Sequence, residues 1–393
     1  MNRLFIECTR TAHSQLHTGI QRFVRRTLHH AQEIARACGN LTVTPVVIDG
    51  NRFMRLSALA PHPHENPREP VAPVEQTEID FLPGDRLLMI DAAWHLDAWP
   101  ALHAAHAQGV RIHFVWHDLI PLLHPEFFDA HVSTRFSHYL SQALEHADGI
   151  VAVSRTVRDQ LAEHIASTMP ARQGKLRLGW NHPGSDLLDD EMRSSKPSIR
   201  AKLTGMTSAM PHTPLLLSVS TLEPRKNHAL LLDMCEQAWA DGLALRLCIV
   251  GKAGWKVESL LERLAHHPEK ERQLFVWHDL TDHELDYCYR HASCLVYPSL
   301  TEGFGLPIAE AGWMGLPVIL SDTPIHREVG GPLASYFDLA QPQQLLQLIA
   351  KMCSAENVFD PRWPETGRFH GWRQSTEKLL QQIIPESFCQ GAN

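Results

Sequence analysis

Short apolar runs alternate with amphipathic segments along most of this 393-residue chain. Residues 3–8, 87–90, 111–116 and 149–153 have the length and continuous hydrophobicity of buried parallel strands. The segments between such runs carry apolar residues every three to four positions, which is the helical period. This alternation predicts an α/β fold built on doubly wound parallel sheets, and the chain is long enough for two of them.

Changes in composition mark the predicted domain limits. Residues 189–213 mix charge, serine, proline and glycine, which is typical of a linker between domains. We therefore predict a first domain over residues 1–190, a linker over 191–212 and a second domain over 213–367. Residues 61–76 are rich in proline and charge, and we expect them to form an exposed insertion.

Charge and cysteine usage narrow the class of protein. The net charge of −8 argues against a nucleic-acid partner, because such proteins usually carry a basic domain. The eight cysteines are scattered without metal-type spacing, which favours buried or free thiols in a reducing compartment. The chain opens without a signal-peptide pattern, and no apolar run approaches the roughly 18–20 residues that span a bilayer. We expect a cytoplasmic protein that is at most peripheral at the inner face of the membrane.

The stretch over residues 299–322, SLTEGFGLPIAEAGWMGLPVILSD, carries the strongest functional pattern. Gly303 and Gly305 allow backbone amides to approach a ligand closely. Pro307 suits the first position of a helix, where its missing N–H group costs nothing. A helix N-terminus attracts anions, so the sequence predicts a phosphate site here.

Two carboxylates accompany this predicted phosphate site. Glu302 lies in the loop, and Glu310 follows eight residues later, in what we expect to be the first helical turn. An ionised carboxylate is a poor partner for phosphate but a good acceptor for the hydroxyl groups of a sugar. The combination predicts a ligand with both phosphate and hydroxyl groups, which describes a nucleotide sugar.

A second strand-to-helix turn carries adjacent cations. The apolar run over residues 214–218 is followed by TLEPRKN, which places Arg225 and Lys226 at the turn. A guanidinium beside an ammonium suits a diphosphate, since it offers fork-like hydrogen bonds and compact charge. The alternative is a pair of ordinary surface cations.

The first predicted domain has candidate ligand groups of its own. Gly19 begins a predicted helix after a strand and a polar loop, which is the layout of a ligand-binding turn, and Arg22 lies on that helix. Arg22 could contact phosphate or an anionic membrane surface, or belong to a solvated basic face. His117 and Asp118 directly follow a predicted strand, where ligand-contacting residues gather. A buried structural pair is the alternative for these two.

The spacing of Glu302 and Glu310 around EGFGLP resembles the Glu-x7-Glu signature of retaining glycosyltransferases of family 4. The resemblance extends over residues 218–227 and 321–331 and is strongest between about residues 213 and 338. It implies the GT-B fold, in which two Rossmann-like domains face an interdomain cleft. It also implies that a helix within residues 368–393 returns to the first domain.

The resemblance assigns a role to each candidate residue. Glu310 is similar to the carboxylate that binds the donor ribose, and Glu302 to the carboxylate that orients the sugar hydroxyls. The implied catalytic residues are His117, Arg225, Lys226 and Glu302. The implied donor-binding residues are Gly19, Gly303, Phe304, Gly305, Leu306 and Glu310. Asp118 and Arg22 are candidates for the acceptor side of the cleft.

The expected chemistry needs neither metal nor cofactor. Preorganised cations and amides stabilise the charge that develops on a leaving diphosphate, and the chain lacks a convincing Asp-x-Asp metal motif. The resemblance implies retention of the anomeric configuration. Front-face attack is the mechanism we favour, and double displacement remains open.

The motifs resemble those of bacterial mannosyl- and rhamnosyltransferases of surface-polysaccharide assembly, such as that of the lipopolysaccharide O-antigen. GDP-mannose is therefore the favoured donor, followed by a dTDP- or GDP-linked deoxyhexose and then a UDP-sugar. The expected acceptor is a glycan or a polyprenyl-linked saccharide. A GT-B epimerase, a glycan phosphorylase and a non-catalytic scaffold are the alternatives from other classes.

Overall fold

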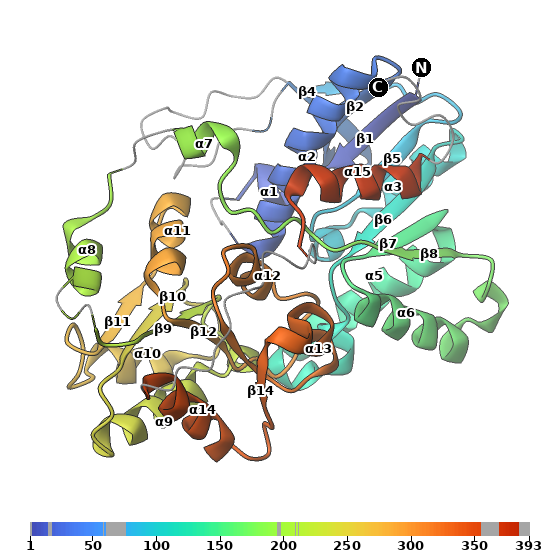
Figure 1. Ribbon diagram of the computed structural model, residues 1–393. Helices are drawn as coiled ribbons and strands as arrows, with labels where there is room; N and C mark the ends of the chain where they lie inside the picture. Colours follow the sequence, from blue (N-terminus) through green and yellow to red (C-terminus); the bar gives the residue numbers. More distant parts are fainter. Residues whose placement is uncertain are drawn as a thin grey trace. The chain divides into compact units, whose positions relative to one another are not determined.

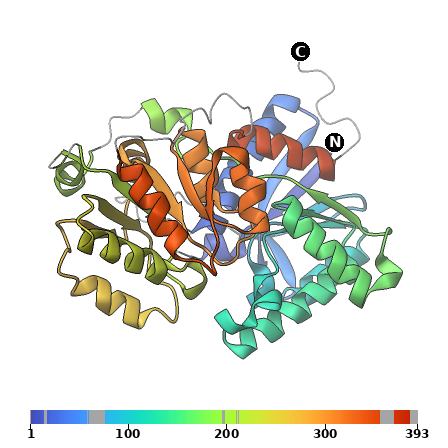
Figure 2. The same ribbon diagram turned by 60° about the horizontal axis from the view of Figure 1, so that its bottom comes forward.

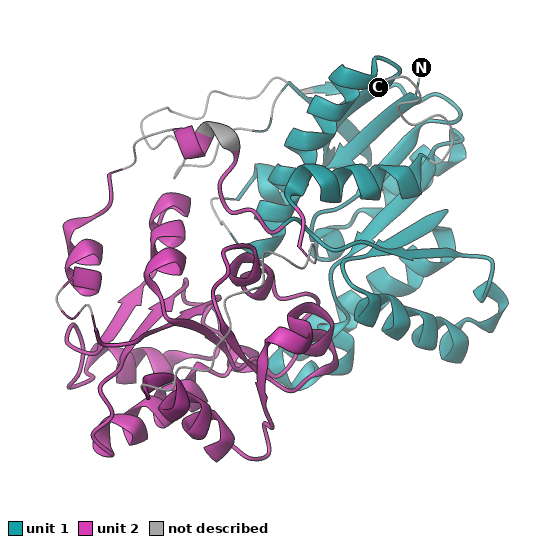
Figure 3. Ribbon diagram, viewed as in Figure 1, with its two compact units in different colours: residues 1–184, 371–393 teal, residues 185–370 magenta. Residues whose placement is uncertain are grey.

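The computed structural model describes residues 2–14, 18–57, 59, 76–194, 198–208, 210, 212–354 and 369–384. These residues form two compact units, which Figure 3 draws in different colours. The first unit comprises the chain up to Gly184 and the segment that begins at Gly371, and the second runs from Ser185 to His370.

The first unit contains an eight-stranded sheet with the order β4-β3-β2-β1-β5-β6-β7-β8. Its strands are β1 (Asn2–Glu7), β2 (Leu41–Asp49), β3 (Arg52–Leu56), β4 (Gln76–Glu78), β5 (Arg86–Met89), β6 (Arg111–Trp116), β7 (Gly149–Ala152) and β8 (Arg177–Trp180). Six strands run parallel, whereas β3 pairs antiparallel with both β2 and β4. The strand order changes direction at β1, which lies between β2 and β5, so the carboxyl ends of β1 and β5 form a topological switch point.

Helices cover both faces of this sheet (Figures 1 and 2). They are α1 (Thr9–Ala12), α2 (Gly19–Cys38), α3 (Trp99–Ala107), α4 (Ile120–Leu123), α5 (Ala130–His146) and α6 (Arg155–Thr168). Phe5, Leu87 and Phe114 of the sheet share one buried core with α3, α5 and α6. Burial of this apolar surface is the main force that holds the layers together.

The last described helix, α15 (Trp372–Ile383), belongs to the first unit although it follows the second in sequence. Its Trp372 ring lies 5.7 Å from the ring of Phe23 on α2. Asn181 donates a hydrogen bond to the backbone oxygen of Ser375 at 3.0 Å. Gly184 is required here, because a Cβ atom would lie 2.4 Å from the backbone of Trp372.

The second unit contains a six-stranded sheet with the order β11-β10-β9-β12-β13-β14, and all its pairs are parallel. The strands are β9 (Leu215–Val219), β10 (Arg246–Val250), β11 (Leu274–Trp277), β12 (Cys294–Tyr297), β13 (Val318–Ser321) and β14 (Ser335–Phe337). The order changes direction between β9 and β12. The carboxyl ends of these two strands are therefore the switch point of the second sheet.

The helices that surround this sheet include α9 (His228–Ala240), α10 (Glu258–Ala265), α11 (Asp282–His291), α12 (Leu306–Trp313), α13 (Pro324–Gly330) and α14 (Gln343–Cys353). Leu231 of α9 and Ile349 of α14 share a fully buried core with Ile249 and Val296 of the strands. The strands read as continuous apolar runs because helices shield both of their faces.

The predicted pair of doubly wound α/β domains is confirmed, with two differences. The first sheet is mixed rather than parallel, because β3 pairs antiparallel with both β2 and the edge strand β4. The predicted linker contains helix α8 (Ala201–Ser208), and α7 (Asp190–Ser194) overlaps its start. The exposed insertion predicted over residues 61–76 lies outside the described residues except for Gln76, the first residue of β4. In the part of the chain that the structure describes, no helix combines the length and apolarity needed to cross a membrane.

Candidate functional site

The candidate donor site lies at the switch point of the second unit. Arg225 and Lys226 follow β9, and Glu302 follows the neighbouring strand β12. A 3-10 turn over Pro224–Lys226 positions the two cations. The turn ends at Asn227, whose φ of 57° is left-handed, a conformation that asparagine tolerates better than most residues. Asn227 precedes α9, but its side chain makes no capping hydrogen bond.

Glu302 is buried and binds both cations. One carboxylate oxygen, Oε1, lies 2.6 Å from Nζ of Lys226, and the other, Oε2, lies 2.8 Å from Nη1 of Arg225. Nη2 of Arg225 also contacts Glu223 at 2.7 Å. Both basic side chains are largely buried, with 15% of Arg225 and 9% of Lys226 exposed. The alternative of ordinary surface cations is therefore wrong.

The charged groups at this site shift one another's pKa values. Burial would raise the pKa of Glu302, but Lys226 and Arg225 outweigh it and hold that pKa well below its usual range. Burial, aided by the charge of Arg225, lowers the pKa of Lys226, and Glu302 opposes this shift. Glu302 is thus ionised across the physiological range and neutralises a cation-rich turn.

Tyr297 completes the network, although the sequence analysis did not single it out. Its hydroxyl group accepts a hydrogen bond from Nζ of Lys226 at 3.0 Å and donates one to Oε1 of Glu302 at 2.9 Å. Tyr297 is the last residue of β12 and is only 1% exposed. Its position at the carboxyl end of a switch-point strand is the signal that could have identified it.

The turn between Glu302 and α12 leads into a helix, as predicted. Gly303, Phe304 and Gly305 are buried, and Gly305 is the N-cap residue with a φ of 91°. A Cβ atom at Gly305 would lie 2.9 Å from the Cδ1 atom of Ile308, and the positive φ is what requires glycine at this position. The helix begins at Leu306, which places Pro307 second rather than first. Proline is still tolerated there, because the N–H groups of the first turn have no partner within the helix.

Glu310 lies on α12 and is 2% exposed. It occupies the fifth position of that helix, so the prediction that it lies in the first turn is wrong by one turn. The hydroxyl group of Tyr289 donates a hydrogen bond to its Oε2 atom at 2.7 Å. Tyr289 on α11 is a second residue of this region that the sequence analysis missed.

In the first unit, His117 follows β6 and is half-buried. Its Nε2 atom lies 2.7 Å from the backbone oxygen of Ile90, so Nε2 carries the proton and donates. Burial lowers the pKa of His117, which keeps the ring neutral with Nδ1 as an acceptor. Asp118 accepts a hydrogen bond from the backbone of Ile120 at 3.0 Å.

Gly19 and Arg22 lie at the start of α2. Thr18 precedes Gly19 and forms a capping box with Gln21, which fixes where the helix begins. Arg22 is half-buried, and Arg26 further along the helix is buried, so the alternative of a solvated basic face is wrong. His17, part of the same predicted glycine loop, lies outside the described residues.

Two buried acids in the first unit were not predicted as site residues from the sequence. Glu7 is the last residue of β1 and is fully buried, and Asp91 follows β5 and is 6% exposed. Each is a charged residue directly after an apolar run, FIE and LLMID, and this pattern could have identified them. They lie at the switch point of the first sheet.

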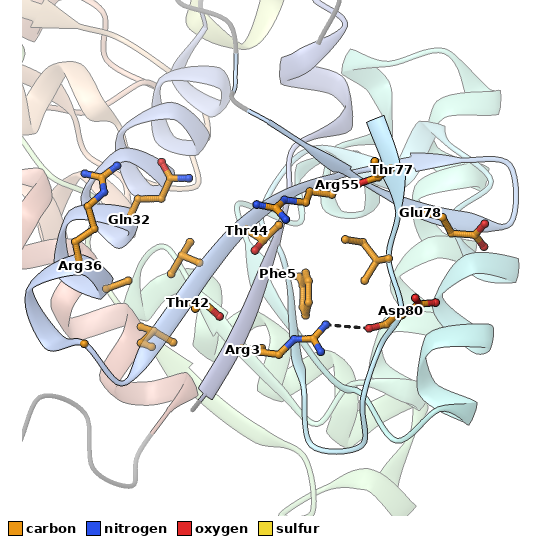
Figure 4. A pocket seen from close by; sticks show the side chains of 15 residues that line it. Arg3, Phe5, Gln32, Arg36, Thr42, Thr44, Arg55, Thr77, Glu78 and Asp80 are labelled. Atoms are coloured by element: carbon orange, nitrogen blue, oxygen red, sulfur yellow. Dashed lines mark hydrogen bonds between the residues drawn. The ribbon is translucent and has the colours of Figure 1, made fainter. Parts of the chain in front are cut away.

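Two other features of the first unit lie away from these strand ends. One is a hollow of about 740 Å³ at the amino-terminal ends of β1 and β2, where Arg3 donates a hydrogen bond to the backbone oxygen of Asp80 at 2.9 Å (Figure 4). The other is formed by His29, His30 and Glu33 on α2, the one group with metal-ligand geometry among the described residues. Glu33 is already bound by His30 at 2.9 Å and by Arg373, and neither feature contributes to the predicted site.

Comparison with solved structures establishes the class of fold. The HepE protein of Anabaena, solved in complex with UDP and glucose, matches with a TM-score of 0.66 at 13% identity, covering 98% of this chain and 100% of that chain. The chain has the GT-B fold, as its two parallel-sheet units and their switch points indicate.

Residues 208–361 match the family model described as glycosyl transferases group 1. The serotype-specific mannosyltransferase WbdA of Escherichia coli is 32% identical over 390 residues, which are 97% of this chain and 46% of WbdA. The O-antigen chain mannosyltransferase RfbU of Salmonella typhimurium is 28% identical over 215 residues, 54% of this chain and 52% of RfbU. The chain spans about half the length of the curated relatives it matches.

Proposed function

We propose that this chain is a retaining, metal-independent glycosyltransferase that acts in the synthesis of a cell-surface polysaccharide. The observation that carries the proposal is the buried Glu302 carboxylate held between Arg225 and Lys226 at the switch point of the second unit. GDP-mannose is the proposed donor, because the relatives that match most of the chain are mannosyltransferases. The proposed acceptor is a hydroxyl group of a glycan or of a polyprenyl-linked saccharide.

The geometry supports a different binding role for each residue around the donor. The described contacts use two of the three N–H groups of Lys226, and we assign the third to the diphosphate. Arg225 and the backbone amides at the start of α12 complete this anion site. Glu302 keeps acceptor capacity for a sugar hydroxyl at Oε2, because the described hydrogen bond from Arg225 uses one of the two lone pairs of that oxygen. Glu310 is assigned to the ribose.

The proposed chemistry is departure of the nucleoside diphosphate from the anomeric carbon. Negative charge develops on the leaving phosphate, and fixed cations in a site of low dielectric stabilise it. The acceptor hydroxyl attacks from the same face, and its proton passes to the leaving phosphate. His117, with Nδ1 as an acceptor, is proposed to contact the transferred sugar from the first unit. Contact with a membrane through Arg22 belongs to the proposal as well.

Product analysis tests this function. The chain is incubated with GDP-mannose carrying ¹³C at the anomeric carbon, and with a mannoside acceptor, in the presence of EDTA. We expect GDP release and an α-mannosyl product by NMR, at a rate that EDTA leaves within about twofold. Parallel reactions with GDP-rhamnose, dTDP-rhamnose, UDP-glucose and UDP-N-acetylglucosamine identify another donor. Inverted product, strict dependence on added manganese, or a free epimerised nucleotide sugar would each contradict the proposal.

A further inference from the structure

Two consecutive histidines and a glutamate share one face of helix α2, where the sequence reads HHAQE from His29 to Glu33. Residues three and four positions apart are neighbours on a helix, so the side chains of His29 and His30 can both reach Glu33. In the part of the chain that the structure describes, this is the one group of three or more histidine, cysteine or acidic side chains whose candidate ligand atoms all lie within 4.8 Å of one another.

The distances between these ligand atoms suit a metal ion. Nδ1 of His30 lies 2.9 Å from Oε2 of Glu33, and Nε2 of His29 lies 3.5 Å from Oε1. Nitrogen and oxygen ligands lie about 2.0–2.2 Å from zinc, which in tetrahedral geometry places them roughly 3.3–3.6 Å from each other. Both measured separations are close to this range, so an ion can bind with small movements of the side chains.

The two imidazole rings converge, although consecutive side chains on a helix are directed about 100° apart. The ring centroids of His29 and His30 are 4.9 Å apart, and the planes are inclined by 76°. The simplest alternative is a hydrogen bond between His30 and Glu33 with no metal. That bond accounts for the ring of His30 but not for the approach of His29 to the same carboxylate.

Burial and charge also favour a cation at this place. His30 is buried and therefore fixed, whereas 55% of the His29 side chain and 36% of the Glu33 side chain are exposed, which leaves an entry path from solvent. Burial would raise the pKa of Glu33, but His30, His29 and Arg373 outweigh it and lower that pKa. Glu33 is thus an ionised carboxylate beside two imidazoles, and zinc accepts both kinds of ligand.

Arg373 of α15 supplies an outer partner for the carboxylate. Its Nη1 atom lies 3.4 Å from Oε2 of Glu33, and its Nε atom lies 3.4 Å from Glu377 on its own helix. Both contacts are longer than a strong charge-assisted hydrogen bond, so Arg373 does not hold Glu33 exclusively. Ligating carboxylates are usually oriented by a further hydrogen bond, and here that bond comes from the helix that packs against α2.

We propose that His29, His30 and Glu33 bind one zinc ion, with water completing the coordination, and that the ion stabilises the first unit. The site is separate from the predicted donor contacts, because His29 follows Gly19 by ten positions, about 15 Å along α2. The inference does not depend on the proposed function, and zinc here is compatible with transfer that needs no metal.

Titration of zinc into the full chain, stripped of metal by a chelator and measured by calorimetry, tests the proposal. We expect one tight zinc ion per chain. Loss of an outer partner typically weakens metal binding about 10–100-fold, so His29→Ala and Glu33→Gln, which each remove a ligand, should weaken it at least tenfold. His103→Ala is the control, because the rings of His103 on α3 and His146 on α5 are also close, at 4.7 Å, but belong to no group of three ligands. This variant should bind zinc as wild type does.

Thermal unfolding provides a second readout, because an ion that binds only the folded chain raises its melting temperature. Zinc should raise the melting temperature of wild type and of His103→Ala, EDTA should reverse the rise, and both ligand variants should lack it. Circular dichroism verifies folding, and Glu33→Gln, which keeps the side-chain shape, serves if His29→Ala is unfolded.

The proposal is overturned if wild type takes up no stoichiometric zinc, if both ligand variants bind as wild type does, or if His103→Ala loses the tight ion. Transfer activity separates this site from the proposed function. His29→Ala should transfer at the wild-type rate, and loss of transfer in EDTA with an active His29→Ala would count against metal-independent transfer alone.

Discussion

Lys226 is a buried cation that contributes both to the candidate site and to the stability of the second unit. Desolvation of Lys226 and Glu302 is offset by their 2.6 Å contact and by the hydroxyl group of Tyr297. Removing one partner of such a pair typically costs about 3–5 kcal/mol, because the other charge stays buried. The side chain therefore contributes to the fold of the second unit as well as to the proposed chemistry.

Lys226→Met should lower kcat/KM for transfer by at least 100-fold, about 3 kcal/mol, because a donor to developing phosphate charge is lost. Methionine keeps most of the volume, so the loss cannot be ascribed to a cavity. Arg225 remains to hold Glu302, and the variant should stay folded with a lowered melting temperature. Lys351→Met, the same change at an exposed position of α14, is the control. Turnover near that of wild type would remove Lys226 from the mechanism.

Tyr297→Phe should lower kcat about tenfold while the ring contacts stay in place. The hydroxyl group fixes Nζ of Lys226 and Oε1 of Glu302, at 3.0 and 2.9 Å, and its loss leaves both less well oriented. Steady-state kinetics and nucleotide binding on the same preparation separate orientation from affinity. An unchanged kcat would show that the network positions nothing that the reaction needs.

Residues of the donor site could be predicted because they lie in contiguous patterns. The turns TLEPRKN and EGFGLP each place a charged group next to a backbone feature that only certain residues allow. The contact of Glu302 with both cations could not be predicted, because it joins β9 and β12 across 76 positions of sequence. Tyr297 and Tyr289 look like ordinary apolar strand and helix residues until that packing is known.

Helix α12 is the element on which the candidate site depends most. Its N-cap, Gly305, has a φ of 91°, and its first turn follows directly from the loop that holds Glu302. A helix end of this kind presents backbone amides that have no partner inside the helix.

Gly305→Ala should destabilise the second unit by roughly 1–3 kcal/mol, because alanine is strained at positive φ and its Cβ would meet Ile308 at 2.9 Å. Gly205→Ala is the matched control, since Gly205 lies within α8 and has open space around it. Alanine there should be neutral or stabilising by up to about 1 kcal/mol. Urea unfolding measures both, and equal stability of the two variants would contradict the role of Gly305.

The parallel strands and their connecting helices were easier to predict than the edge strands of the first sheet and the helix in the linker. Apolar runs predicted parallel strands such as β1, β5, β6 and β7, because burial on both faces leaves a continuous signal, whereas the parallel strand β8 was not predicted. Helix α15 was implied by the family resemblance. The antiparallel strands β3 and β4 were not predicted. The first has five residues without a continuous apolar run, and the second has three residues next to a proline-rich stretch. Helix α8 was missed because glycine, serine and threonine in residues 201–208 read as linker.

At the scale of the whole molecule, Glu7 should make stability depend on pH. Its pKa is raised from 4.5 to about 8 in the folded chain, so between these values the folded state binds a proton that the unfolded state has lost. Stability is therefore complete below about pH 4.5 and falls as pH rises towards 8, by at most about 5 kcal/mol from this group. The urea midpoint of wild type should decrease over this range more steeply than that of Glu7→Gln. Parallel slopes would show that Glu7 is ionised in the folded chain.

The donor site in the second unit is tested most directly by the affinity for nucleoside diphosphates. Calorimetry compares GDP, UDP and dTDP on wild type, Glu302→Gln and Glu310→Gln, since glutamine keeps the shape and removes the charge. We predict that wild type prefers GDP and that Glu310→Gln weakens GDP binding at least tenfold. Glu302→Gln should bind GDP as tightly as wild type or more tightly, because it releases Arg225 and Lys226 from their carboxylate, while transfer falls at least 100-fold. Loss of affinity in Glu302→Gln with normal affinity in Glu310→Gln would reverse the two roles. A wild-type chain that binds none of the three would contradict the account.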